Sequence, residues 1–78
     1  MTIEQMRAAR EASHFRPFTL HLADGRSHRV PHRDYLSMSP GGRTVIVYQS
    51  DEAFRILDLF LVTELTIDTP RMQTGDGS

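Results

Sequence analysis

The feature that most constrains the fold is an alternating apolar pattern that leads into an Asp-Gly pair. Apolar residues occupy every second position over residues 18–22, and Asp24 and Gly25 follow almost directly. Such alternation places the apolar side chains on one face of a strand, and a glycine tolerates the left-handed backbone that reverses the chain. The pattern therefore predicts a β-hairpin over residues 18–30, in a small protein built mainly of strands.

The register of this hairpin follows from the face on which Val30 lies. A two-residue loop at positions 24–25 would turn Val30 away from the core. A three-residue loop at positions 23–25, with Gly25 in a bulge, pairs Phe18 with Val30 on a single face. We favour the longer loop because it buries Val30, and it predicts a positive φ at Gly25.

A short helix is predicted before the hairpin. Thr2 has a side chain suited to the N-cap, and Gln5 three residues later completes a capping box. The helix should fade by Ser13, because Pro17 disfavours helical geometry at the residue before it. We expect this helix to lie against a sheet.

Further runs of apolar residues predict strands after the hairpin. They occupy residues 35–39, 44–48, 54–57 and 65–67. Residues 58–64 fit either a continued strand or a helical turn. We therefore expect one α+β domain over residues 1–68, with the N-terminal helix packed on a small, strongly bent antiparallel sheet of about five strands. Residues 69–78 are predicted to form a disordered C-terminal tail, because Met72 is their one large apolar residue.

Length and composition limit the class of protein. A chain of 78 residues forms one small domain, which buries roughly 60% of its unfolded surface and favours a binding surface over a deep catalytic pocket. The absence of cysteine excludes disulfides and thiolate zinc sites. The chain begins without a signal-peptide pattern, and its longest apolar run, residues 59–62, is too short to cross a bilayer. We expect a cytoplasmic protein with no membrane partner.

Charge is distributed unevenly along the chain, although its net value is −1. Residues 1–46 hold seven arginines against four acidic residues, whereas residues 47–78 hold two against six. The densest basic segment ends beside an aromatic ring, an arrangement that could hold phosphates while the ring stacks on a base. The candidate nucleic-acid-binding residues are Arg26, Arg29, Arg33 and Tyr35. The alternative is a solvated edge strand whose charge prevents aggregation.

Four histidines lie within one short stretch, at positions 14, 21, 28 and 32. In the favoured register His21 and His28 point to opposite faces of the hairpin, so they cannot share a metal ion. No nucleophile elbow and no phosphate-binding Gly-Lys-Ser/Thr loop is present. We therefore expect no metal site, no cofactor and no catalytic residues, and hence a protein that is not an enzyme.

Residues 54–67 carry more large apolar side chains than one side of a small sheet needs. One interpretation is that both faces of this segment are buried within the chain. The other is a subunit interface, because exposed apolar patches normally mark interaction sites. The candidate interface residues are Phe54, Ile56, Phe60 and Leu61.

A family resemblance accompanies these patterns. The first motif of Sm-like proteins is similar to two segments of this chain, Phe18-x-Leu20-x-Leu22-x-Asp24-Gly25-Arg26 and Asp34-Tyr35-Leu36. The resemblance implies an N-terminal helix and a five-stranded open barrel that assembles into rings and often binds RNA. The family's second motif, an arginine-glycine signature, has no match in residues 56–66. The chain also resembles short bacterial proteins of unassigned function that share its residues 2–5 and 16–19.

Together these observations predict a small bacterial, non-enzymatic interaction module. We expect it to form a homo-oligomer, with a separate protein partner as a further possibility. The alternative is an Sm-like protein that binds RNA or single-stranded nucleic acid.

Overall fold

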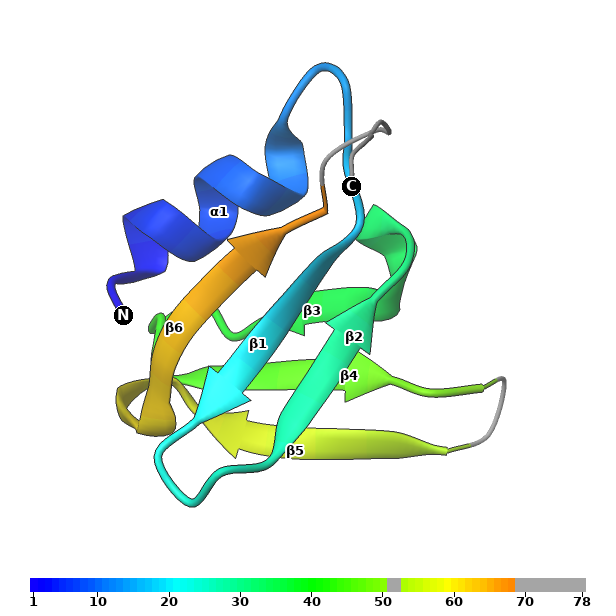
Figure 1. Cartoon of the computed structure of the whole chain (residues 1–78). Coiled ribbons are helices and arrows are strands. Elements are labelled where there is room, and N and C mark those ends of the chain that lie inside the picture. Colours follow the sequence, from blue (N-terminus) through cyan, green and yellow to red (C-terminus); the bar gives the residue numbers. More distant parts are fainter. Residues whose placement is uncertain (51–52, 69–78) are drawn as a thin grey trace.

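One N-terminal helix and two antiparallel three-stranded sheets make up the fold (Figure 1). This computed structural model describes residues 1–50 and 53–68, so the predicted tail at residues 69–78 lies outside the described residues. The elements are α1 (Ile3–Glu11), β1 (Phe18–Leu22), β2 (Ser27–Val30), the 3-10 turn η1 (Arg33–Tyr35), β3 (Leu36–Met38), β4 (Thr44–Tyr48), β5 (Phe54–Asp58), the 3-10 turn η2 (Leu59–Leu61) and β6 (Val62–Ile67).

The two sheets have the strand orders β2-β1-β6 and β3-β4-β5. The α+β class and the antiparallel pairing are confirmed. The expected single, strongly bent sheet of about five strands is wrong, because six strands form two sheets that neither close into an Sm-like barrel nor curl strongly. The physical reason is the turn between β2 and β3. Pro31 has no N–H to continue the ladder, and η1 then carries the chain from one sheet into the other.

The register of the first hairpin is confirmed. Phe18 pairs with Val30, and Leu20 pairs with His28. Gly25 has a φ of +92°, and its N–H donates to the carbonyl of Leu22 at 3.0 Å. The three-residue loop therefore turns Val30 inward, as the burial argument required.

The core lies between the inner faces of the two sheets and the buried side of α1. Its fully or nearly fully buried apolar residues are Met6, Phe18, Leu20, Leu22, Val30, Leu36, Val45, Val47, Leu57, Leu59 and Val62. The strands alternate accordingly, with buried and partly exposed residues in turn along β1 and β4. This alternation leaves one face of each sheet directed to solvent.

The helix begins with the predicted capping box. The Gln5 N–H donates to Thr2 Oγ1 at 3.2 Å, and the Thr2 N–H donates to Gln5 Oε1 at 3.0 Å. Met6 packs in the core, and Arg10 Nε donates to the carbonyl of Leu36 at 2.7 Å. These contacts hold α1 at the side of the molecule where β3 and β6 lie, and in Figure 1 the helix runs beside β6.

Residues 58–64, whose sequence fits either a strand or a helical turn, form the turn η2 followed by the start of β6. The side chain of Asp58 accepts a hydrogen bond from the Phe60 N–H at 2.9 Å and starts η2. The chain re-enters the first sheet as β6, which pairs with β1. Within residues 1–50 and 53–68, no helix has the length and apolar character needed to cross a membrane.

The hairpin turn allows a test of the backbone conformation alone. A Cβ atom added at Gly25 would meet no heavy atom within 4 Å, so the cost of Gly25→Ala comes only from the positive φ. We expect the free energy of unfolding to fall by about 1 kcal/mol. Gly41→Ala is the matched control, since Gly41 has equal space and no positive φ. Urea denaturation should show no loss for Gly41→Ala; equal losses in both variants would contradict the assigned turn.

Candidate functional site

The four predicted interface residues all lie at the surface. Their exposed fractions are 53% for Phe54, 65% for Ile56, 67% for Phe60 and 54% for Leu61. Three other apolar residues of the same segment are buried in the core, namely Leu57, Leu59 and Val62. The segment therefore divides between core and surface, and we call the four exposed residues the apolar strip.

Neighbouring apolar side chains extend the apolar strip across the outer face of the second sheet. Ile56 pairs with Ile46 across β4 and β5, and the Phe54 ring lies 6.1 Å from the Tyr48 ring. Cross-strand pairs of this kind stabilise a sheet, yet here they face outward. None of the elements that the structure describes covers Phe54 or Ile56.

The outer face of the first sheet is polar by contrast. Thr19 pairs with Arg29, and His21 Nε2 lies 2.9 Å from Thr66 Oγ1, within hydrogen-bond distance. Arg29 also binds the carboxylate of Asp68, with 2.6 Å between the nitrogen and the oxygen. Of the two sheets that the structure describes, the second therefore turns apolar cross-strand pairs toward solvent, and the first does not.

A charged cluster lies at the η2 end of the apolar strip. The Arg43 guanidinium lies 4.4 Å from the centre of the Phe60 ring, close enough for a cation–π interaction. The same guanidinium is 3.6 Å from the Asp58 carboxylate. The Phe60 ring is thus contacted by the Arg43 guanidinium on one side, while most of the residue remains exposed.

The predicted nucleic-acid-binding residues are not assembled into one free basic surface. Arg26 binds the Asp24 carboxylate at 2.7 Å, and the hydrogen bond from the Arg26 backbone N–H lowers the pKa of Asp24. Arg29 is paired with Asp68. Arg33 donates to the carbonyl of Ala12 at 2.8 Å.

The fourth predicted residue of this group, Tyr35, is half-buried and packs against the core. Its ring lies 5.9 Å from that of His32. Each of the three arginines therefore has an intramolecular partner, and the aromatic ring is only partly available for stacking.

The histidines of the first hairpin point to opposite faces, as the register predicted. His21 lies on the outer face, whereas His28 lies inward opposite Leu20 and is buried. Its Nε2 atom has no hydrogen-bond partner. Burial lowers the pKa of His28, and the positive charges of Arg26 and Arg55 act in the same direction. In the part of the chain that the structure describes, no three His, Asp or Glu side chains are grouped as a metal site requires.

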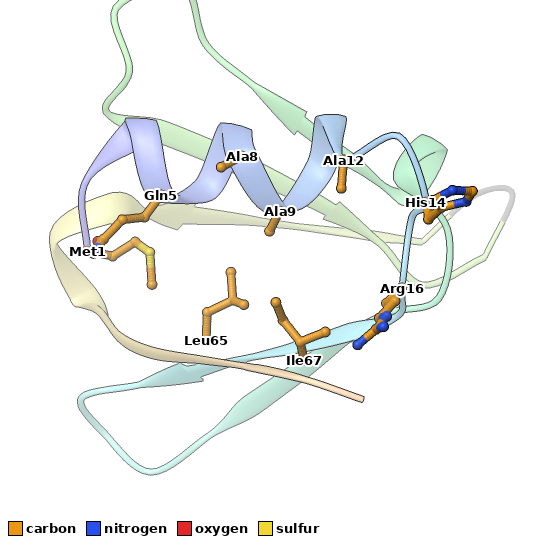
Figure 2. A pocket seen from close by; sticks show the side chains of 9 residues that line it. All are labelled: Met1, Gln5, Ala8, Ala9, Ala12, His14, Arg16, Leu65 and Ile67. Carbon is orange, nitrogen blue, oxygen red and sulfur yellow. The ribbon is translucent and has the colours of Figure 1, made fainter. Parts of the chain in front are cut away.

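A groove that no sequence pattern indicated lies between α1 and β6 (Figure 2). Its volume is about 570 Å³, and Leu65 and Ile67 point from β6 toward the helix. The lining residues are Met1, Gln5, Ala8, Ala9, Ala12, His14, Arg16, Leu65 and Ile67. The signal that could have found it is the series of alanines on α1, whose small side chains leave the space open.

No protein-family model, curated protein or solved structure matches this chain.

The buried His28 predicts a dependence of stability on pH. Below about pH 6.5 the unfolded chain binds a proton on this ring, whereas the folded protein resists protonation there. The free energy of unfolding should therefore fall as the pH falls through this range. We expect His28→Leu to remove that part of the fall, measured by urea denaturation at several pH values. His14→Leu, at an exposed position, retains His28 and should retain its contribution; an unchanged slope in His28→Leu would contradict the assignment.

Proposed function

We propose that this protein is a cytoplasmic, non-enzymatic interaction module that forms a homo-oligomer through the apolar strip. The observation that carries the proposal is the outward apolar face of the β3-β4-β5 sheet, where Ile56 pairs with Ile46 and Phe54 contacts Tyr48. The first sheet, with its polar outer face, has no comparable surface.

The composition of the apolar strip suits a subunit interface. Aromatic residues and arginine are enriched at the buried centres of interfaces, and Phe60 with Arg43 combines both. Fully burying one large apolar side chain stabilises by about 1.5–3 kcal/mol. The four side chains are only 53–67% exposed, so association would add roughly half of this amount for each of them, which over two copies still offsets much of the entropy lost on association.

Symmetry supports contact between identical faces. In a two-fold dimer the same surface is used by both copies, so one apolar face is sufficient. β5 is also an edge strand of its sheet, with β4 as its described neighbour. The strip therefore lies where a second copy can approach without displacing any described element.

Binding of RNA or single-stranded nucleic acid, which the resemblance to Sm-like proteins implies, has less support. Arg26 and Arg29 are already paired with Asp24 and Asp68, and release of these pairs would weaken phosphate binding. If nucleic acid were the ligand, affinity for a random oligonucleotide would fall steeply with salt. Self-association driven by apolar contact would not weaken as the salt concentration rises.

Oligomer mass tests the proposal. Light scattering at micromolar concentration should give a multiple of the 8.9 kDa chain mass. Ile56→Asp should lower the mass to that of a monomer while the far-ultraviolet circular dichroism spectrum is retained, because Ile56 is 65% exposed and contributes little to the core.

Ile67→Asp provides the matched control, since Ile67 is also half-exposed but lies on β6, away from the strip. The control should keep the oligomer mass. A monomeric wild-type protein would contradict the proposal. If Ile67→Asp dissociated the oligomer and Ile56→Asp did not, the interface would lie at the groove beside Ile67 and not at the apolar strip.

A further inference from the structure

The groove between α1 and β6 lies against the outer edge of β6, where the N-terminal amine of Met1 donates to the carbonyl of Val62 at 3.2 Å. In the first sheet β6 is hydrogen-bonded to β1 on one side and is the terminal strand of the described sheet on the other. The Asp68 N–H donates to the carbonyl of Pro17 at 2.9 Å. In an antiparallel ladder the backbone N–H and C=O groups of every second residue point toward the partner strand. Those of Asp68 point toward β1, so those of Leu65 and Ile67 point toward the free edge.

The side chains of the same two residues line the groove. Leu65 and Ile67 point toward α1, and the alanines of the helix form the opposite wall (Figure 2). An extended chain that paired with Leu65 and Ile67 would therefore direct every second side chain into the groove. Backbone hydrogen bonds and an apolar pocket are available to the same ligand.

Both ends of the groove carry positive charge, from the N-terminal amine of Met1 at one end and from Arg16 at the other. Arg16 and His14 line the end beside Ile67, and no acidic side chain is among the lining residues. Within the described residues, Arg16 forms none of the ion pairs. This end of the groove is therefore complementary to an acidic group.

We infer that the groove and the β6 edge bind an extended peptide of a partner protein by strand addition. The peptide runs antiparallel to β6, the slightly more stable pairing. It carries two small apolar residues two positions apart, opposite Leu65 and Ile67. An acidic residue, two positions before the first of these apolar residues, lies at the Arg16 end of the groove. A lipid could fill the groove, but it would leave the edge N–H and C=O groups of β6 without partners.

A designed peptide tests this inference with the full chain. The probe is fluorescently labelled Asp-Thr-Val-Thr-Val-Thr with an amidated C-terminus, and the measurement is fluorescence anisotropy. We expect saturable binding. N-methylation of both valine amides, which would face β6, should weaken it by about tenfold or more. N-methylation of the alternate threonine amides, which would face away, is the matched control and should leave binding unchanged.

Variants of the protein separate the groove from the rest of the surface. Ala8→Leu, at an exposed helical position lining the groove, should fill the space and weaken binding by about tenfold at nearly constant helix propensity. Arg16→Gln should weaken binding of the aspartate probe but not of its asparagine analogue. Arg7→Gln removes an equal charge from α1 outside the groove and should have no effect.

Each contrary result overturns the inference. Equal effects of the two N-methylation patterns would exclude strand addition, and binding of laurate without binding of the peptide would assign the groove to a lipid. Peptide binding that appears only after deletion of residues 69–78 would assign it to the chain itself. Ile56→Asp should bind the probe normally, so that failure of self-association and failure of peptide binding are distinguishable.

Discussion

β1 is hydrogen-bonded on both sides, so the alternation of its side chains governs the register of two ladders at once. Its inward residues pair with His28 and Val30 of β2 and with Leu65 and Ile67 of β6. A slip of one residue in either ladder would exchange the inner and outer faces of the slipped strand. The polar outer face of the first sheet and the apolar walls of the groove are therefore two consequences of one alternating pattern.

The two 3-10 turns decide which surfaces remain uncovered. η1 carries the chain from β2 into the second sheet, and η2 returns it from β5 to β6. Both β5 and β6 end as terminal strands of their sheets. The helix lies beside β6, where the Met1 amine donates to the carbonyl of Val62, and it leaves the outer face of the second sheet uncovered. The apolar strip and the groove thus arise from the same chain path but occupy different elements.

Local features of this chain were predictable because they depend on neighbouring residues. The capping box at Thr2, the register that buries Val30 and the positive φ of Gly25 all follow from short-range patterns. The division into two sheets was not predictable, since it depends on the direction in which η1 leaves Pro31. The groove depends on the distance between α1 and β6, which only tertiary packing sets. Ile67 illustrates this limit: it lies inward by alternation, yet it is half-exposed because the groove opens beside it.

The exposed apolar residues give a physical reason for so small a domain to associate. Phe54 and Ile56 lie on the face of β5 opposite the buried Leu57, so alternation along the strand turns them away from the core of their own chain. Within residues 1–50 and 53–68 their apolar area stays exposed, and contact with a second molecule would remove it from water. A domain of this size gains limited stability from its own core, and any partner that binds only the folded state adds to that stability by mass action. Association through the strip would therefore couple the folding of each copy to the concentration of the others.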